Sequence, residues 1–420
     1  MKILIMNCGS SSVKFQLIDI EHEEVLAKGI VEKIGGSDAI INYQGKGEDK
    51  IREVLEVLRH EDAIGMITML LLHPRHGVLK HKKEIAGVGH RVVHGGEEFS
   101  KSVLITDPVK AAIEKFIQFA PLHNPHNLKG IKACERLLPD APQVAVFDTA
   151  FHHTIPPKAF IYGLPYAFYQ KLGIRRYGFH GTSHRYVAAK AAEILGRPAE
   201  SLKIITCHLG NGASITAVEG GKSVDTSMGF TPLEGLIMGT RCGDLDPALV
   251  PYIMEKENLS TKQIDSIMNK NSGMLGLTGT SNDMREILAE AGRGCEQHRL
   301  AIEIYCYRVR KYIGAYMAAL GGADAIVFTG GIGENAVPIR ELTLKGMDSL
   351  GITVDPEKNA KHQTDIGTGA VRILVIPTNE ELAIGRDTAE ILSQTPRCME
   401  AQQREASPFV RNGKTIPAVS

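Results

Sequence analysis

Three glycine-rich turns, each directly after a run of apolar residues, constrain this chain more than any other feature. They lie at residues 8–12 (Cys-Gly-Ser-Ser-Ser), 208–212 (His-Leu-Gly-Asn-Gly) and 329–335 (Thr-Gly-Gly-Ile-Gly-Glu-Asn). The chain has 43 glycines in 420 residues without a collagen-like period, so many of them mark sharp turns or close approaches to a ligand. Peptide N–H groups exposed in such turns bind phosphate oxygens, which favours nucleotide binding.

None of these turns matches a widely used nucleotide-binding fingerprint. The chain contains no G-x-x-x-x-G-K-[ST] sequence, and the 208–212 turn lacks the third glycine of G-x-G-x-x-G. Each turn alone is also consistent with an ordinary hairpin or strand-to-helix connection. The three together favour a phosphate-binding role outside the P-loop and Rossmann classes.

Short β-branched or alternating runs predict strands, and spaced apolar residues predict helices. The predicted strands are, in chain order, 2–7, 13–20, 25–30, 85–93, 143–147, 203–207, 213–218, 325–328 and 372–376. Apolar residues at 51, 54, 55 and 58 predict one helix, and Asp107 followed by proline predicts the start of a second. A third is expected to begin near Glu380. Such alternation is typical of layered α/β domains.

The two halves of the chain share one pattern. A strand, a glycine turn and a second strand at 203–218 repeat the arrangement at 2–20, which predicts duplicated α/β domains facing each other. We expect a first domain at residues 1–149 and a second at 150–379. A helix at about 380–394 is expected to return to the first domain, and residues 395–420 are expected to form a flexible tail.

Composition narrows the class of protein. Lys and Arg together number 48, as do Asp and Glu, so the net charge is zero and gives no general attraction to nucleic acids or membranes. The seven cysteines include no C-x-x-C pair, which argues against a disulfide framework. No uninterrupted apolar stretch reaches the roughly 20 residues of a membrane span. We expect a cytoplasmic protein without nucleic-acid or membrane partners.

The predicted strand 85–93 carries a candidate binding site for a small acid. Alternation along a strand places Arg91 and Val93 on one face. A guanidinium holds a carboxylate through two hydrogen bonds while valine contacts an alkyl group, although a structural ion pair is the alternative. Asp148 directly follows the strand 143–147, where functional acids of open α/β sheets lie, although it could also cap the next turn.

Further cations and histidines lie in glycine-flanked loops. Residues 175–181 contain two arginines and a histidine, and residues 239–244 contain Arg241. Loops of this composition often place side chains over a charged substrate, and solvated surface charge is the alternative. The adjacent histidines 152–153 invite a metal interpretation, but no H-E-x-x-H sequence accompanies them, which disfavours zinc catalysis.

A series of longer motifs occurs in order along the chain, at residues 7–15, 90–96, 121–125, 146–152, 176–184, 208–212, 239–241 and 330–335. These sequences, among them Asn-Cys-Gly-Ser-Ser-Ser-Val-Lys-Phe and Val-Phe-Asp-Thr-Ala-Phe-His, resemble the acetate kinase family, a branch of the sugar kinase/Hsp70/actin superfamily. The resemblance extends over residues 1–394. Cys8, where many members have serine, is a minor departure.

The resemblance implies an α/β fold of two duplicated actin-like (ribonuclease H-like) domains with a ligand cleft between them. It implies reversible transfer of the γ-phosphoryl group of ATP to acetate, which gives ADP and acetyl phosphate. Mg²⁺, or Mn²⁺ in its place, is the implied metal. A homodimer and a place in acetyl-CoA biosynthesis are further expectations.

The family roles transfer to matching positions of this chain. The implied catalytic residues are Arg91, Asp148, His180 and Arg241. The implied acetate pocket consists of Arg91, Val93, Leu122, Phe179 and Pro232, and the implied metal-associated pair is Asn7 and Glu380. The implied nucleotide contacts are Lys14, His208, Leu209, Gly210, Asn211, Gly212, Asp283, Met284, Arg285, Gly331, Ile332, Gly333, Glu334 and Asn335.

Charge is the central difficulty of the implied reaction, because acetate and the γ-phosphate are both anions. A carboxylic acid with a pKa of roughly 4 is already ionised at neutral pH and needs no general base. We therefore expect Asp148 to orient Arg91 or a metal-bound water rather than to remove a proton. The metal, Arg91, Arg241, Lys14 and His180 are expected to balance the negative charge during a direct in-line transfer.

Two alternatives stay open at this point. A propionate or butyrate kinase would use the same residues, because one methylene changes binding in an apolar pocket by only ~1–3 kcal/mol. A non-catalytic, ATP-gated module of the actin or Hsp70 kind would use the nucleotide to control domain closure. That module would need neither Arg91 beside Val93 nor Arg241, so the presence of all three argues against it.

Overall fold

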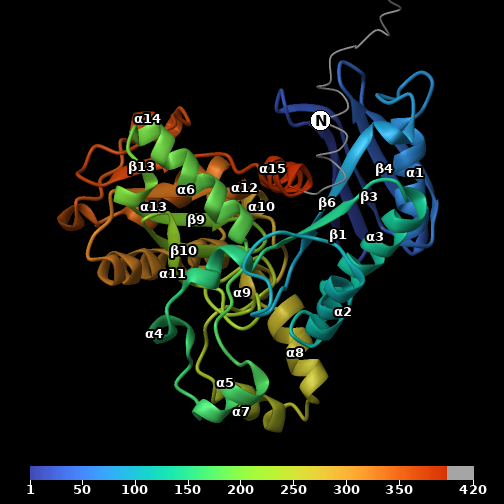
Figure 1. The fold of residues 1–420 in the computed structure, drawn as a ribbon. Helices are drawn as coiled ribbons and strands as arrows, with labels where there is room; N and C mark the ends of the chain where they lie inside the picture. The colour runs from blue at the N-terminus through green and yellow to red at the C-terminus, as the bar shows by residue number, and fades with distance from the viewer. Residues whose placement is uncertain (395–420) are drawn as a thin grey trace, which may run out of the picture.

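Two lobes, each built around a mixed β-sheet, make up residues 1–394, the part of the chain that the computed structural model describes (Figure 1). The first sheet contains β1 (Lys2–Cys8), β2 (Ser12–Asp19), β3 (Glu24–Glu32), β4 (Gly36–Gly45), β5 (Ile51–Val57), β6 (Ile85–Val92), β7 (Val103–Leu104) and β8 (Gln143–Phe147). The second contains β9 (Lys203–Leu209), β10 (Ala213–Glu219), β11 (Lys222–Thr226), β12 (Ala325–Thr329) and β13 (Arg372–Val375).

Helices cover both sheets. They are α1 (His60–Leu71), α2 (Asp107–Lys115), α3 (Asn124–Leu137), α4 (Pro157–Phe160), α5 (Tyr166–Leu172), α6 (Gly181–Leu195), α7 (Leu249–Lys256), α8 (Thr261–Lys270), α9 (Gly273–Thr278), α10 (Met284–Gly292), α11 (Glu296–Leu320), α12 (Gly330–Asn335), α13 (Val337–Leu344), α14 (Pro356–Ala360) and α15 (Glu380–Ser393). In Figure 1, α1 and α3 lie beside the first sheet, whereas α6, α11 and α13 lie in the lobe of the second.

One four-strand pattern occurs in both sheets. β1 pairs antiparallel with β2 and parallel with β6, and β6 pairs parallel with β8. In the same way β9 pairs antiparallel with β10 and parallel with β12, and β12 pairs parallel with β13. The glycine turns 8–12 and 208–212 therefore occupy equivalent hairpins. The duplicated α/β fold expected from the sequence is confirmed.

The predicted strands are also confirmed, with ends that differ by a few residues, but the helix predicted at 51–58 is wrong. Residues 51–57 form β5, which pairs with β4 at the edge of the first sheet. Leu55 and Val57 turn toward the core, whereas Val54 and Leu58 are 59% and 57% exposed. Apolar residues on both faces of this edge strand produced a spacing that resembles a helix.

The last helix, α15, packs on the first sheet. Its residues Leu382, Ile384 and Leu392 share a buried cluster with Ile5 and Val144 of that sheet. The helix can approach β6 closely because Gly89 of that strand has no side chain. In Figure 1, α15 lies between the two lobes. The domain limits of 149 and 379 remain predictions, and the predicted tail at 395–420 lies outside the described residues.

No helix within residues 1–394 combines the length and apolar character that crossing a membrane requires.

Replacing Gly89 with alanine tests the packing of α15 on β6. A Cβ at position 89 would lie 2.4 Å from Thr388 Oγ1 and 2.8 Å from Ile384 Cγ2. Gly89→Ala should therefore lower the free energy of unfolding by ~1–3 kcal/mol in chemical denaturation. Gly65→Ala in α1 is the matched control: its Cβ would meet no atom within 4 Å, and a gain of up to ~1 kcal/mol is expected. Equal effects of the two substitutions would contradict the close packing.

Candidate active site

A two-pronged ion pair joins Arg91 and Asp148. Arg91 lies on β6 and Asp148 directly follows β8, its parallel neighbour, so both side chains emerge at the same edge of the sheet. Arg91 Nε and Nη2 donate to Asp148 Oδ1 and Oδ2 at 3.0 and 2.6 Å. Asp148 is 1% exposed whereas the Arg91 side chain is 23% exposed. The guanidinium is thus oriented by a buried carboxylate and still open to a ligand.

His180 precedes α6 in a backbone conformation that few residues adopt. Its φ is +56°, in the left-handed region, where a side chain costs roughly 1–2 kcal/mol. The next N–H, of Gly181, donates to the Asp148 carbonyl at 2.9 Å, and a Cβ at Gly181 would lie 2.3 Å from that oxygen. This approach, which requires glycine, holds His180 beside the Arg91–Asp148 pair.

Two histidine rings stack at the junction of the lobes. The centroids of His180 and His208, the latter near the end of β9, are 4.3 Å apart. Burial, followed by the charges of neighbouring groups including Arg91, lowers the pKa of His180 well below 6.5. Burial and Arg91 lower the pKa of His208 to about 4. Burial therefore favours the neutral imidazole at both positions. The expected contribution of His180 to charge balance stays a prediction.

Arg241 reaches the same junction from the loop that follows β11. Its Nη1 donates to the Pro232 carbonyl at 3.2 Å, and no carboxylate within residues 1–394 forms an ion pair with it. Burial and the charge of Arg91 lower its pKa. A Cβ on Gly212 would lie 3.4 Å from His180 Nε2 and 3.5 Å from Arg241 Nη1. The imidazole and the guanidinium therefore converge on the 208–212 turn.

Glu380, the first residue of α15, is a half-buried carboxylate facing this junction. Burial and the neighbouring acids Asp148 and Glu381 raise its pKa to about 7, although nearby cations oppose the shift. A carboxylate in this position fits a divalent cation, which would relieve the repulsion. Asn7 is the next-to-last residue of β1 and lies opposite Lys14 of β2, and its amide oxygen is a second possible ligand.

Protein groups alone do not enclose a metal ion. No cluster of three or more His, Cys, Asp or Glu side chains within residues 1–394 could hold one. Mg²⁺ commonly binds through one or two carboxylates together with phosphates and water. The pair Asn7 and Glu380 fits such a site only when a phosphate-bearing ligand completes it.

A cavity of about 800 Å³ lies in the second lobe beside the glycine turns. From the nucleotide set predicted by resemblance, it is lined by Gly210, Asn211, Asp283, Met284, Arg285, Gly331, Ile332 and Asn335. Asp283 caps α10 by accepting from the Arg285 N–H at 2.9 Å. The cavity therefore combines exposed turns with the beginning of a helix.

The remaining nucleotide residues lie elsewhere. Leu209 and Gly333 are buried, and Leu209 belongs to the core of the second lobe. Glu334 accepts from the N–H groups of Gly330 and Thr378 at 2.9 and 3.1 Å, so it braces the turn. His208 and Gly212 face His180, and Lys14 lies on the first lobe. These positions support the cavity or adjoin the junction rather than line the cavity.

The residues predicted to contact the alkyl group differ in burial and contacts. Val93 and Phe179 are 4% and 1% exposed in one buried cluster, which places an apolar surface near Arg91. Pro232 is bonded to Arg241 through its carbonyl. Leu122 is 44% exposed. An apolar surface next to a guanidinium suits a short-chain carboxylate.

The two arginines of the loop 175–181 form ion pairs within the protein. Arg175 Nη1 lies 2.5 Å from Glu97, and Arg176 Nη2 lies 2.6 Å from Glu234. Their charges are therefore already paired.

Sequence reasoning missed several residues of this region. The charges of Arg241 and Arg91, added to burial, lower the pKa of His123 to about 4, so His123 lies near both guanidinium groups. Asn282 donates to Asn211 Oδ1 at 2.9 Å and lines the nucleotide cavity. His123 lies inside the motif 121–125, and Asn282 directly precedes the predicted contact Asp283, so these positions were the available signal. Leu288, which also lines the cavity, carries no sequence signal.

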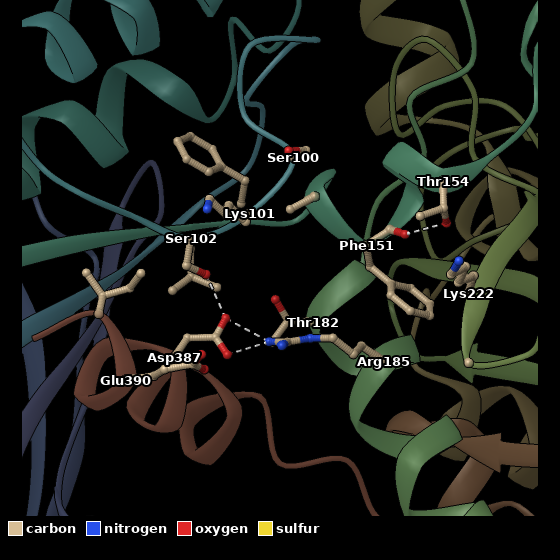
Figure 2. Close-up of a pocket in the computed structure, with 15 residues that line it drawn as sticks. Ser100, Lys101, Ser102, Phe151, Thr154, Thr182, Arg185, Lys222, Asp387 and Glu390 are labelled. Carbon is tan, nitrogen blue, oxygen red and sulfur yellow. Dashed lines mark hydrogen bonds and ion pairs between the residues drawn. The ribbon is translucent and has the colours of Figure 1, made fainter. Parts of the chain in front are cut away.

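A second cavity, of about 300 Å³, lies between the lobes and contains none of the predicted site residues (Figure 2). Asp387 of α15 accepts from Ser102 of the first lobe at 2.6 Å and from Arg185 of α6 at 2.8 Å. Figure 2 shows these three side chains meeting across the cavity. The contact ties the helix that follows His180 to the helix that begins with Glu380.

The sequence model of the acetokinase family matches residues 2–386. The chain belongs to the acetokinase family. It is 54% identical over 397 residues to the acetate kinase of Halothermothrix orenii, covering 93% of this chain and all of that one. The family resemblance inferred from the motifs is confirmed.

Solved structures of this family have the same fold. The crystal structure of Porphyromonas gingivalis acetate kinase is 47% identical with a TM-score of 0.89, covering 93% of this chain and 99% of that chain. A propionate kinase from Francisella tularensis is 45% identical with a TM-score of 0.89 and the same coverage. The fold of this chain is therefore the actin-like, ribonuclease H-like fold, and the chain is a phosphotransferase.

The buried histidines predict marked destabilisation in acid. Burial lowers the pKa of His90, His152 and His208 to about 4 each, whereas an unfolded histidine titrates near 6.5. The unfolded chain therefore binds more protons between these values, and stability present above pH 6.5 is lost as the pH falls. Each group contributes up to about 1.4 kcal/mol per pH unit. Urea unfolding at pH 7.5, 6.5 and 5.5 measures this loss.

The variant His90→Gln provides the control, because glutamine retains a polar side chain next to Gln143 without taking up a proton. Its stability should fall less than that of the parent between pH 6.5 and 5.5. Parallel pH profiles would show that His90 does not remain neutral.

Proposed function

We propose that this chain catalyses the reversible transfer of the γ-phosphoryl group of ATP to acetate, giving ADP and acetyl phosphate. The observation that carries the proposal is the convergence of Arg91, Arg241 and His180 on one junction, with Arg241 lacking an acidic partner within residues 1–394. Asp148 compensates the charge of Arg91, whereas Arg241 has no such partner within residues 1–394, so an anionic ligand at the junction would be stabilised by the uncompensated guanidinium. The names of the similar proteins agree with this reaction.

The carboxylate acceptor is placed by Arg91. Asp148 holds the guanidinium through two bonds, and it is this orientation, rather than proton removal, that we assign to Asp148. The apolar side chains of Val93 and Phe179 would receive the methyl group. A carboxylate oxygen would then face the phosphoryl group without the need for a base.

The nucleotide would occupy the 800 Å³ cavity, with its phosphates directed along the glycine turns toward His180 and Arg241. Glu380 and Asn7 would hold Mg²⁺, or Mn²⁺, together with the phosphates. The metal would neutralise phosphate charge. Arg241 and His180 would donate to the equatorial oxygens of the transferring group during a direct in-line transfer.

A propionate or butyrate kinase is the second candidate. The Francisella tularensis relative bears the name propionate kinase at 45% identity. One added methylene is worth only ~1–3 kcal/mol, so the same site would accept both acids to different extents.

The proposal also includes a homodimeric assembly and a cytoplasmic location. Exposed apolar side chains gather on residues 164–172 and on α7, namely Leu164, Tyr166, Phe168, Leu172, Leu249 and Tyr252. Apolar surface of this kind supports association into a homodimer. The cysteines within residues 1–394 are free, which agrees with a cytoplasmic location. The two lobes would be the domains 1–149 with 380–394, and 150–379.

A hydroxamate assay tests the proposal directly. Hydroxylamine traps acyl phosphates, so ATP, Mg²⁺ and acetate should give acetohydroxamate, and kcat/KM should fall from acetate to propionate to butyrate. A preference for propionate would establish the second candidate. Absence of product with all three acids, from protein that binds ATP, would favour a non-catalytic nucleotide-binding module instead.

Replacing Arg241 tests its assignment to the transition state. Arg241→Ala should lower kcat by ~10³-fold or more and change the KM for acetate by much less, because the group binds charge that develops during transfer. Steady-state kinetics in both substrates measure the two constants. Arg176→Ala is a control, since Arg176 is paired with Glu234 away from the junction. A variant changed only in KM would show that Arg241 binds the ground state equally.

A further inference from the structure

A continuous chain of hydrogen bonds runs from the second sheet to His180. Thr206 Oγ1 lies 2.7 Å from His184 Nδ1, and His184 Nε2 lies 2.7 Å from Ser214 Oγ. Ser214 Oγ in turn lies 2.9 Å from His180 Nδ1. Thr206, His184 and Ser214 are all fully buried, so no solvent competes for these bonds.

Several elements assemble this chain. His180 and His184 are four residues apart at the start of α6, one helical turn, and both reach the same hydroxyl. Ser214 lies on β10, directly opposite His208 of β9, and Thr206 lies two residues before His208. The far side of the His180 ring, Nε2, lies against Gly212 near Arg241. The hydrogen-bond chain therefore ends at the proposed site of phosphoryl transfer.

A neutral imidazole has one N–H, and its position decides what His180 does. With the proton on Nε2, the ring presents a donor toward Arg241 and the phosphoryl oxygens. With the proton on Nδ1, it presents a lone pair, which repels the same oxygens. Burial and nearby cations keep the pKa of His180 low, so a second proton does not remove the choice.

The Ser214 hydroxyl allows two complete arrangements, because it has one proton and lies between two ring nitrogens. In the first, His184 Nε2–H donates to Ser214, and Ser214 donates to His180 Nδ1. In the second, both bonds are reversed. The first leaves the His180 proton on Nε2, and the second leaves it on Nδ1.

Thr206 distinguishes the two arrangements. In the first, the Thr206 hydroxyl donates to His184 Nδ1 at 2.7 Å. In the second, His184 Nδ1 holds a proton, and the Thr206 hydroxyl must donate elsewhere. Its other acceptor is the Thr216 carbonyl at 3.4 Å, close to the limit of a hydrogen bond. The first arrangement makes every bond short and satisfies every buried proton.

We propose that Thr206, His184 and Ser214 are positioning residues that hold His180 as the tautomer protonated on Nε2, so that this N–H donates to the phosphoryl group during transfer. This inference rests on the proposed function for the identity of the acceptor. His180 supplies a neutral donor beside the charged donor of Arg241. A neutral donor adds a hydrogen bond to the equatorial oxygens without placing a third positive charge beside Arg91 and Arg241.

Ser214→Ala is the decisive variant, and Ser223→Ala is its matched control. Ser223 is also fully buried and lies 2.9 Å from a buried histidine, His152, but it has no bond to His180. Both variants should lower Tm to a similar extent. Ser214→Ala should lower kcat by about 10- to 100-fold, less than the loss of a whole transition-state donor. Its KM values for ATP and acetate should stay within about threefold of the parent, and Ser223→Ala should retain kcat within about threefold.

Nitrogen NMR reads the tautomer without reference to activity. In protein labelled with ¹⁵N-histidine, the resonances of His180 are those absent from His180→Gln. We expect Nε2 to have the chemical shift of a protonated nitrogen in the parent and in Ser223→Ala, and a mixture of tautomers in Ser214→Ala. A parent protonated on Nδ1, or a Ser214→Ala variant with unchanged kcat, would overturn the inference.

The outcomes separate this inference from the function on which it rests. If the parent forms no acyl phosphate, the proposed function fails whatever the NMR spectrum shows. If the parent is active and the proton lies on Nδ1, the function stands and the positioning role is wrong.

Discussion

The buried contact of Asp148 with Arg91 is the interaction on which the rest of the site depends. The Asp148 carboxylate holds the guanidinium through two bonds, and the backbone carbonyl of Asp148 accepts from the Gly181 N–H. Burial, with a contribution from the charge of Asp148, raises the pKa of Glu380. One residue therefore orients Arg91, anchors the start of α6 and affects the titration of Glu380. No carboxylate within residues 1–394 forms such a pair with Arg241. The positive charge of its guanidinium is therefore free to interact with an anionic ligand.

The duplicated fold explains how such distant segments meet. Equivalent hairpins present the turns 8–12 and 208–212, and the parallel strands β6 and β8 end at one sheet edge. α15 returns to the first sheet after the second is complete, and this return brings Glu380 beside Asp148. The tie among Ser102, Arg185 and Asp387 then links α15 to the helix that follows His180.

Much of this could be predicted, and the failures have physical causes. Strands buried on both faces, such as β8 and β12, are continuous apolar runs that sequence reveals directly. β5 is exposed on one face at a sheet edge, and its scattered apolar residues resembled a helical spacing. The motif resemblance named Leu209 and Gly333 because they lie within the glycine turns, whereas the structure buries both residues. Hydrogen bonds such as that from Asn282 to Asn211 join segments too far apart in the sequence to be inferred from spacing.

The amino-acid sequence by itself determined the family, the alternation of strands and helices, the glycine turns and the identities of the ionisable groups, because these depend on residue type and local spacing. Only the tertiary structure decided which groups are charged and which face a ligand. Burial removes water from the His180 ring and lowers its pKa, and Arg176 is unavailable because Glu234 lies against it. Desolvation and charge pairing depend on distances between segments that the linear chain leaves open.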